Sequence, residues 1–204
     1  MRLKLILTAV TFLFIANFAT AKTPENTVKN LKDAIIGETT ASTKYAAYAK
    51  QADKEGFSKI AVLFRAASKA ESIHANNHRS VLKDLGVKMD DFTPEYEVKS
   101  TKENLQDAIN GETYEVKTMY PDFLKAAKED NVNLAMISFN YAYQTEKKHA
   151  ELYKNALSEL EAGNENKLAA KYFVCSTCGN TYENEAPARC GISMTPKERF
   201  ISID

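Results

Sequence analysis

The sequence predicts a mainly α fold, in which a four-helix bundle over residues 22–165 is followed by a small β domain over residues 170–204. Three observations support this prediction. Glycine and proline are scarce, at 7 and 5 in 204 residues, which favours long helices over a many-stranded sheet. Apolar residues recur at helical spacing in four stretches, with one long polar connection in the middle. The character of the chain then changes, and all three cysteines fall in the last part.

The first 21 residues have the composition of a secretory signal peptide and are excluded from the fold. Arg2 and Lys4 give a positive start, residues 5–18 are almost entirely apolar, and residues 19–21 form a small-x-small cleavage site. The apolar run is shorter than the roughly 20 residues that a membrane span needs. We therefore expect an exported chain that begins at Lys22, resides in the periplasm or another extracytoplasmic space, and has no membrane anchor.

The first two predicted helices form a hairpin. The first helix opens at Pro24, which suits the first position of a helix. Its inward stripe contains Leu31 and Ile35, and Glu38 falls in the same stripe. The second helix is predicted over residues 58–86, where apolar residues recur at heptad spacing up to a glycine.

The third and fourth predicted helices form a second hairpin, after a polar linker over residues 87–100. A capping box of Ser100 and Glu103 opens the third helix. Pro121 is expected to kink or break this helix, because proline cannot donate a backbone hydrogen bond. The fourth helix is predicted over residues 132–161, closed by a glycine-containing segment.

A weak internal repeat relates the two hairpins. Residues 34–39 of the first helix resemble residues 108–113 of the third, and each segment places a glutamate, Glu38 or Glu112, in an inward stripe. The next helix of each hairpin carries a Glu-x-x-His motif, formed by Glu71 with His74 and by Glu146 with His149. Matching polar residues in two hairpins imply a pseudo-twofold site between them.

These motifs predict a metal site inside the bundle. Residues three apart on a helix share a face, so each Glu-x-x-His aims a carboxylate and an imidazole inward. With Glu38, Glu112 and Glu115, which lies one turn beyond Glu112, five carboxylates would be buried, at a high cost unless positive charge compensates them. One glutamate from each of two helices and Glu-x-x-His from each of the other two is the ligand pattern of di-iron bundles. Such donors suit iron or manganese.

A single Glu-x-x-His is more often a solvated helical pair or a cap. Here two of the three histidines follow a glutamate at the same offset, and no lysine or arginine lies in the inward stripes to pair with the glutamates. The third histidine, His78, lies one turn beyond His74, but its counterpart on the fourth helix is Tyr153. We therefore expect His78 to pack beside the site rather than to bind metal.

The C-terminal part contains a second candidate site. Cys175-Ser-Thr-Cys178-Gly resembles the first knuckle of a rubredoxin, where paired cysteines in a tight turn bind iron. The second knuckle should supply another cysteine pair. Cys190 is in place, but the fourth position is Ser193. A disulfide and a zinc site of three cysteines with one further ligand are the alternatives. Two aromatic residues, Tyr172 and Phe200, are expected to pack the small domain.

Several segments together carry a resemblance to one family: Gly37-Glu38 with Tyr45, Glu71 to His74, Gly111 to Glu115, Met119 to Phe123, and Glu146 to His149. With the cysteine knuckle, they resemble rubrerythrin over nearly all of the mature chain. The resemblance implies a ferritin-like bundle that binds about two iron ions per chain. It also implies a rubredoxin-like (zinc-ribbon-like) β domain that holds iron or zinc at Cys175, Cys178, Cys190 and Ser193.

The same resemblance assigns roles within the bundle. The implied iron ligands are Glu38, Glu71, Glu112, Glu115, Glu146 and His149. His74 would exchange with Glu115 as one iron shifts between redox states, while Tyr45 and Tyr120 would hydrogen-bond near the site. These last four residues are the candidate catalytic residues.

Rubrerythrins reduce hydrogen peroxide to water, so the resemblance implies a peroxidase that protects against oxidative stress. The C-terminal site would pass in electrons from a donor such as a rubredoxin-type protein or a reductase. In the family this transfer occurs between subunits, so a homodimer is expected. The rival functions are ferritin-like iron storage or ferroxidase activity, and di-manganese catalase activity. Basic and acidic residues balance at 27 each, so charge gives no argument for binding nucleic acid or an anionic membrane.

Overall fold

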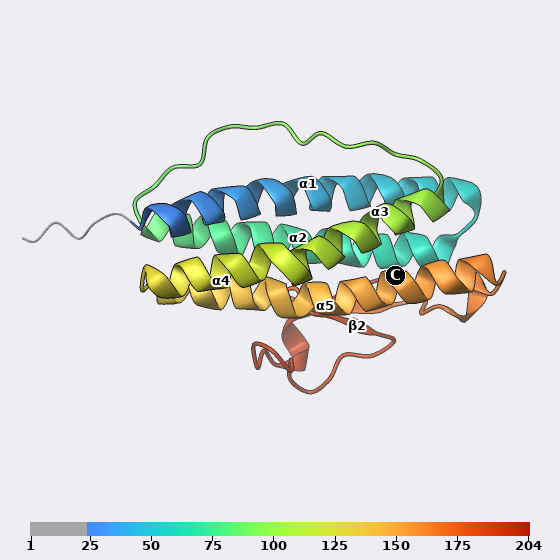
Figure 1. Cartoon of the computed structure of the whole chain (residues 1–204). Helices are drawn as coiled ribbons and strands as arrows, with labels where there is room; N and C mark the ends of the chain where they lie inside the picture. Colours follow the sequence, from blue (N-terminus) through green and yellow to red (C-terminus); the bar gives the residue numbers. More distant parts are fainter. Residues whose placement is uncertain (1–23) are drawn as a thin grey trace, which may run out of the picture.

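The computed structural model describes residues 24–204, and the predicted signal peptide lies outside the described residues. Four long helical rods lie side by side, and a small sheet packs against one face of the bundle (Figure 1). This is the mainly α fold that the sequence predicts. The helices of the rods are α1 (Glu25–Glu55), α2 (Ser58–Asp84), α3 (Thr101–Tyr114), η1 (Glu115–Met119), α4 (Tyr120–Glu129) and α5 (Asn133–Glu161).

The first hairpin closely follows its predicted bounds. Helix α1 ends at Gly56, whose φ of 88° is a left-handed conformation that glycine adopts without strain. The inward stripe of α1 is buried as predicted, with Leu31 and Ile35 at 0% exposure and Glu38 at 1%. A glutamate is therefore carried into the bundle by the same periodicity that buries its apolar neighbours.

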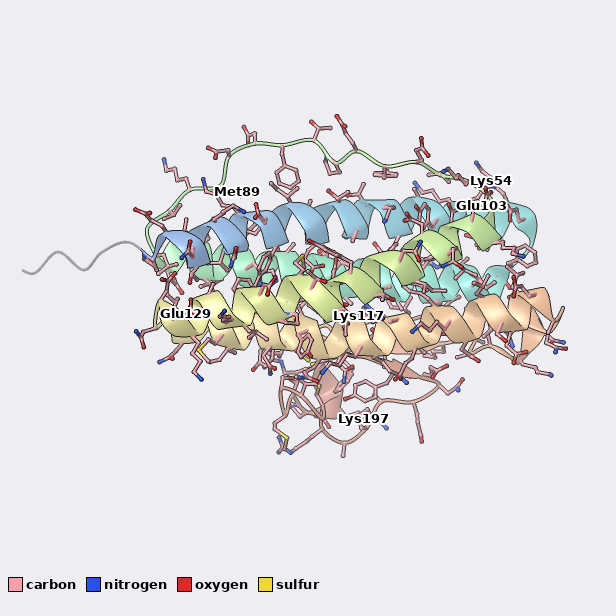
Figure 2. The ribbon with its side chains drawn as sticks, in the orientation of Figure 1. Lys54, Met89, Glu103, Lys117, Glu129 and Lys197 are labelled. Atoms are coloured by element: carbon pink, nitrogen blue, oxygen red, sulfur yellow. The ribbon has the colours of Figure 1, made fainter. Side chains whose placement is uncertain are left out.

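An extended segment over residues 87–100 connects the two hairpins. It runs along the outside of α1 to the start of α3 (Figures 1 and 2), and its Met89 and Phe92 pack partly buried against the bundle. The predicted capping box is present: Ser100 Oγ accepts from the backbone N–H of Glu103, and the Glu103 carboxylate accepts from the N–H of Ser100. The linker thus sets the starting point of α3.

The interruption predicted at Pro121 is a π-helical turn rather than the end of a helix. Helices α3, η1 and α4 form one continuous rod (Figure 1), and Pro121 occupies the first turn of α4, where its missing N–H costs little. A π-turn adds one residue relative to an α-helix and so rotates the next helical turns by about 100°. This rotation returns Tyr120 to the inward face that Glu112 occupies, and Tyr120 is 0% exposed. Lys117 of η1 points outward (Figure 2).

The C-terminal part contains a small antiparallel sheet. Its elements are η2 (Glu165–Lys167), β1 (Tyr172–Cys175), β2 (Thr181–Glu183), η3 (Lys197–Arg199) and β3 (Phe200–Ile203). The three strands have the order β2-β1-β3, and the central strand places Tyr172 opposite Glu183 on one side and Ile203 on the other.

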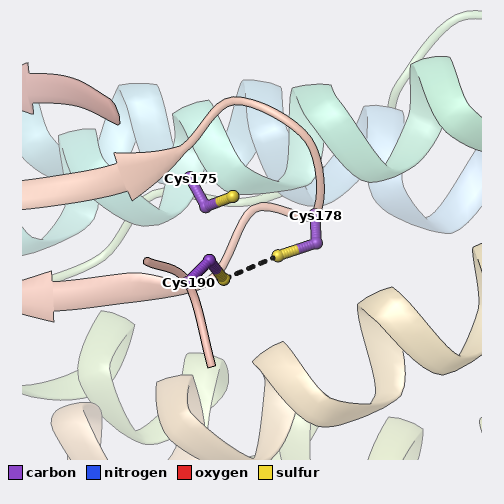
Figure 3. Close-up of side chains that lie close together, drawn as sticks. All are labelled: Cys175, Cys178 and Cys190. Carbon is purple, nitrogen blue, oxygen red and sulfur yellow. Dashed lines mark hydrogen bonds between the residues drawn. The ribbon is translucent and has the colours of Figure 1, made fainter. Parts of the chain in front are cut away.

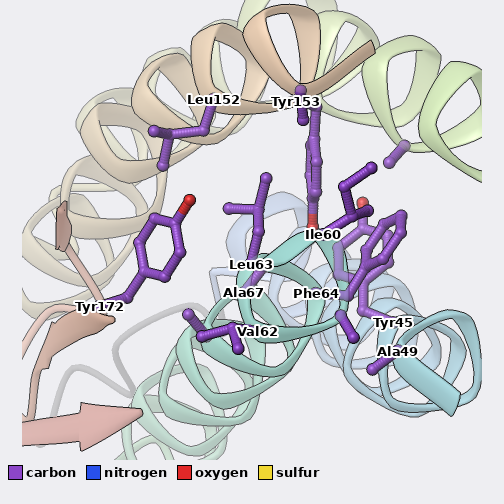
Figure 4. Packing of buried hydrophobic residues seen from close by; sticks show 14 of the residues in the cluster. Tyr45, Ala49, Ile60, Val62, Leu63, Phe64, Ala67, Leu152, Tyr153 and Tyr172 are labelled. Atoms are coloured by element: carbon purple, nitrogen blue, oxygen red, sulfur yellow. The ribbon is translucent and has the colours of Figure 1, made fainter. Parts of the chain in front are cut away.

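Two apolar clusters occupy the two ends of the bundle and leave a polar centre between them. Strand β1 contributes Tyr172 and Val174 to one of these clusters, and Figure 4 shows Tyr172 beside Leu63 and Leu152. Tyr172 was predicted to pack the small domain, but it packs into the bundle core, while Phe200 does pack within the sheet region, against Tyr182. Burial of β1 side chains therefore fixes the sheet on the bundle.

No helix within residues 24–204 combines the length and the apolar character needed to cross a bilayer.

Candidate metal centres

Carboxylates from four helices meet in the polar centre of the bundle. Glu38 comes from α1, Glu71 from α2, Glu112 from α3 and Glu146 from α5, and none is more than 2% exposed. With the two histidines they form two overlapping sets, in each of which the donor atoms lie within 4.8 Å of one another. The sets are Glu38, Glu71, His74 and Glu146, and Glu71, Glu112, Glu146 and His149. Glu71 and Glu146 belong to both, so two carboxylates are shared between two four-donor groups.

Both imidazoles present Nδ1 to the carboxylates. Nδ1 of His74 lies 2.9 Å from Glu71 Oε2 and 2.8 Å from Glu146 Oε1, and Nδ1 of His149 lies 3.0 and 2.9 Å from the other oxygens of the same two residues. Nε2 of each ring points away from the centre, His74 to the carbonyl of Cys178 and His149 to Oγ1 of Thr181, each at 2.9 Å.

These outer hydrogen bonds select the tautomer of each neutral ring. A carbonyl oxygen can only accept, so Nε2 of His74 carries the hydrogen. Thr181 Oγ1 donates to the carbonyl of Gly179 and therefore accepts from His149. Nδ1 of both rings is then left with a lone pair facing the carboxylates, which is the form that binds a metal.

Most of the buried donor atoms lack a hydrogen-bond partner. Both carboxylate oxygens of Glu71 and Glu146, one of Glu38, and Nδ1 of both histidines have no hydrogen-bond partner although they are buried. Such groups are expensive to leave unsatisfied. Two divalent cations would satisfy all of them, so the donor set fits a pair of hard or borderline metal ions.

Burial and the crowding of carboxylates also shift the pKa values of the donor residues. Burial, reinforced by the nearby carboxylates of Glu146 and Glu71, raises the pKa of Glu38 to about 8. Burial also raises the pKa of Glu71, but the imidazoles of His149 and His74 outweigh it and lower the value to about 2. Burial lowers the pKa of both histidines, yet the surrounding carboxylates raise it well above its ordinary value. In the absence of a metal, the centre therefore holds protons.

The two tyrosines singled out from the sequence connect the hairpins. Tyr45 on α1 donates to Glu112 Oε1 on α3 at 2.7 Å, and Tyr120 at the start of α4 donates to Glu38 Oε1 on α1. Each hairpin thus orients a glutamate of the other. Glu115 opens η1, is only partly buried, and belongs to neither four-donor set. Burial and the carboxylates of Glu38 and Glu112 raise its pKa well above its ordinary value.

His78 lies outside both donor sets, although it is 0% exposed. Its Nδ1 is 2.7 Å from Ser138 Oγ and its Nε2 is 3.2 Å from the hydroxyl of Tyr120. The sequence patterns do not identify Ser138 or Thr181, because a single hydroxyl residue carries no spacing signal.

The three cysteines form a second buried cluster. Their thiols are free, and their Sγ atoms lie within 4.8 Å of one another (Figure 3). Sγ of Cys178 is 3.4 Å from Sγ of Cys190, and Oγ of Ser193 is 3.2 Å from Sγ of Cys175. The hydrogen bond from Cys178 is the largest influence on Cys175 and lowers its pKa to about 4. The thiols form no disulfide, and the hydroxyl of Ser193 lies beside the cluster in contact with Cys175.

The two centres touch each other through the backbone. The carbonyl of Cys178 accepts from His74 Nε2 at 2.9 Å and from Thr145 Oγ1 at 3.1 Å. The next residue, Gly179, has a φ of 79°, and a Cβ built there would overlap the His74 ring and come 3.2 Å from the carbonyl of Ala70. Both hydrogen bonds form within one chain, and the expected transfer between subunits stays a prediction.

Comparison with known proteins agrees with both centres. The family model described as rubrerythrin matches residues 29–157. Nigerythrin from Nitratidesulfovibrio vulgaris is 34% identical over 202 residues, covering 95% of this chain and 94% of that protein. Rubrerythrin-2 from Clostridium acetobutylicum is 33% identical, covering 83% and 92%.

Solved structures give the same result. The fully reduced, all-ferrous state of nigerythrin matches with a TM-score of 0.78 and 32% identity, covering 99% of this chain and 100% of that one. Bacterioferritin from Mycobacterium tuberculosis matches with a TM-score of 0.64 and 17% identity over 71% of this chain, which shows a shared fold alone. The bundle is therefore ferritin-like, and the likeness to nigerythrin extends over both centres.

Proposed function

The chain belongs to the rubrerythrin family, and from this premise we propose that it is a di-iron peroxidase that reduces hydrogen peroxide to water. The observation that carries the proposal is the hydrogen bond from His74 Nε2 to the carbonyl of Cys178. It joins a donor set of the bundle to the thiol cluster, so that electrons arriving at an iron ion held by the thiols would have a short covalent and hydrogen-bonded route inward. A protein that only stores iron has no use for such a route.

Peroxide reduction consumes two electrons and two protons and yields two molecules of water. When bound, a pair of ferrous ions supplies the two electrons. Glu71 and Glu146, which belong to both donor sets, would be shared between the ions, with Glu38 and His74 completing one set and Glu112 and His149 the other. Tyr45 orients Glu112 and Tyr120 orients Glu38, and burial of the centre excludes bulk water from the carboxylates.

Glu115 and His74 would be the two ligands that exchange when the redox state of the centre changes. His74 is in a donor set, whereas Glu115 begins the π-turn and lies outside both sets. Single π-turns inside α-helices are frequent at functional sites, and the side chain of Glu115 is only partly buried beside the centre. We therefore assign Glu115 as the ligand that replaces His74 when one iron shifts.

The test is a single turnover under anaerobic conditions. Full-length protein is loaded with two ferrous ions in the bundle and one at the thiol cluster, and one equivalent of hydrogen peroxide is added. We expect both bundle irons to be oxidised, followed by oxidation of the C-terminal site, with no release of dioxygen. Dioxygen release without net iron oxidation would identify a catalase instead, and an assembly of ferritin-cage size that accumulates many irons per chain would identify storage.

Export and partners complete the proposal. The chain would be cut after residue 21, act as a homodimer against peroxide outside the cytoplasm, and receive electrons from a rubredoxin-type protein or a reductase. Cytoplasmic nicotinamide-linked donors would then be out of direct reach. Mass spectrometry of the protein from its host should find Lys22 at the N-terminus, and retention of Met1 in a cytoplasmic fraction would refute export.

A further inference from the structure

A chain of three hydrogen bonds leads from the metal centre toward the surface through His78. It begins at Glu38 Oε1, which accepts from the hydroxyl of Tyr120. The oxygen of Tyr120 lies 3.2 Å from Nε2 of His78, and Nδ1 of His78 lies 2.7 Å from Oγ of Ser138. The four residues come from α1, α4, α2 and α5, so each of the four rods contributes one member.

The donors in this chain all point inward. Tyr120 donates its only hydrogen to Glu38, so its oxygen accepts from Nε2–H of His78. Nδ1 of His78 then carries a lone pair and accepts from the hydroxyl of Ser138. Three donors in a row with one direction are the arrangement needed to move a proton toward Glu38. The corresponding tyrosine of the other half, Tyr45, has no such extension, because the counterpart of His78 there is Tyr153, whose hydroxyl is buried without a partner.

The outer end of the chain meets a surface pocket. Ser138 is 5% exposed and lines a pocket of about 190 Å³ between α2 and α5. The polar side chains of Asn77, Ser80 and Asp84 line the same pocket, so water that enters it finds hydrogen-bond partners. A water molecule there can replace a proton that Ser138 passes on.

The imidazole in the middle of the chain remains neutral. Burial lowers the pKa of His78 to about 3, and the charges of His74 and Arg79 act in the same direction. A neutral ring keeps one N–H and one lone pair on opposite edges, which a relay requires. Phe139 and Tyr120 pack around the ring, with centroids 5.2 and 6.1 Å away.

We propose that Ser138, His78 and Tyr120 form a proton-entry path that serves the metal centre. In each passage Ser138 gives its proton to Nδ1 of His78 and takes one from pocket water, Nε2 gives its proton to Tyr120, and Tyr120 gives its own to Glu38. One proton enters and one is delivered, so the net charge of the three residues is unchanged. Rotation of the hydroxyls and a turn of the ring restore the starting arrangement. This inference rests on the proposed peroxidase function, whose reaction consumes two protons.

The first experiment tests the geometry without any metal. In metal-free, full-length protein, nitrogen–proton correlation spectra should show His78 as the neutral Nε2–H tautomer over about pH 5 to 8. Ser138→Ala should shift the Nδ1 resonance of His78 and leave the Nε2–H in place, whereas Ser80→Ala should change neither. A ring protonated at Nδ1, or a Nδ1 resonance that is indifferent to Ser138→Ala, would overturn the path.

The second experiment measures the protons in the reaction. Variants with unchanged bundle iron content are compared in single-turnover peroxide reduction in H₂O and D₂O. Ser138→Ala and His78→Gln should slow turnover by roughly a hundredfold, the scale of a lost proton-transfer group, and change the solvent isotope effect. Glutamine at position 78 keeps a hydrogen-bond donor and an acceptor but transfers protons poorly. His78→Gln therefore distinguishes a proton-transfer role of His78 from a role in packing alone. Ser138→Thr, which keeps the hydroxyl, should restore the rate, and Ser80→Ala should match the wild type.

The outcomes separate the two proposals. If the wild type reduces peroxide and both Ser138→Ala and His78→Gln do so at the same rate with the same isotope effect, the proton path is wrong and the peroxidase function stands. If the iron-loaded wild type fails to reduce peroxide, the proposed function is wrong and the path falls with it.

Discussion

The bundle centre and the thiol centre are both buried, yet they satisfy their polar atoms differently. In the bundle, the oxygens of Glu71 and Glu146 and Nδ1 of both histidines are left without hydrogen-bond partners. In the thiol cluster, Cys175 contacts Ser193, which bonds Thr195, which in turn donates to Thr177. The comparison indicates that the bundle centre needs metal ions to give these atoms partners, whereas the side chains around the thiols already bond to one another.

The two centres also differ in what holds them. Four rods position the carboxylates, and apolar clusters at both ends of the bundle keep those rods in register. The thiols come from one strand end and two loops, and they are supported mainly by the docking of β1 and by the Cys178–His74 contact. The first centre is therefore positioned by the packing of the bundle, and the second depends on the first for its position.

The largest loss of bundle iron is expected from Glu71→Ala, because Glu71 belongs to both donor sets. Glu71→Ala removes a carboxylate that each set uses, so bundle iron should fall from about two ions per chain to a trace, with C-terminal metal unchanged. The folded bundle should survive, because the substitution removes buried charge. Metal analysis with circular dichroism checks this prediction.

Glu115→Ala is the matched variant for that experiment. It removes a carboxylate that lies outside both sets, so it should retain bundle iron and slow only peroxide turnover. Equal iron loss in Glu71→Ala and Glu115→Ala would refute the exchange role of Glu115.

After metal removal, the free energy of unfolding should decrease as the pH rises. Glu38 and Glu112, with His74 and His149, have folded pKa values above their unfolded values. Such groups contribute stability that is complete below the unfolded pKa and is lost as pH rises through the folded pKa. Between about pH 5 and 8 the unfolding free energy of metal-free protein should fall by roughly 1.4 kcal/mol per pH unit for each extra proton bound.

Urea denaturation at several pH values measures this slope, and metal-loaded protein is the control, because bound cations replace those protons. Glu71, with its pKa lowered to about 2, acts below this window. A metal-free protein whose stability is flat or rises between pH 5 and 8 would show that the carboxylates are compensated in another way.

The contact between the centres can be broken at Gly179. In Gly179→Ala the new Cβ overlaps the His74 ring, and the left-handed backbone of this residue disfavours a side chain. We expect a loss of about 2 kcal/mol in unfolding free energy and slower electron transfer from the C-terminal site, with bundle iron retained. Gly163→Ala, at a left-handed position with open space around it, controls for backbone strain, and equal effects of the two variants would contradict the docking role.

Ser193→Cys should have the smallest effect on bundle iron. Its effect should be confined to the metal content of the C-terminal site. A serine hydroxyl is a harder donor than a thiolate and is normally protonated, so the native site should retain iron weakly. The fourth thiol should raise iron occupancy there and produce the visible absorption of a ferric tetrathiolate, while bundle iron stays the same. An unchanged spectrum and metal content would show that residue 193 does not face the metal.

Helix positions and inward donors could be predicted from the sequence because a helix repeats every 3.6 residues. That period assigned Glu38 to the buried stripe of Leu31 and Ile35, and it placed the two Glu-x-x-His motifs on inward faces. The capping box of Ser100 and Glu103 is a signal of the same local kind. In each case the information lies within a few turns of one helix.

Contacts between distant segments were decided by the tertiary structure. Every residue has a backbone carbonyl, so nothing in the sequence marks that of Cys178 as the acceptor for His74. The packing of Tyr172 into the bundle, the π-turn that brings Tyr120 inward, and the meeting of Ser138 with His78 likewise depend on how separate elements dock. Periodicity states which face of a helix is buried, but the partner of that face is chosen by the packing of the whole chain.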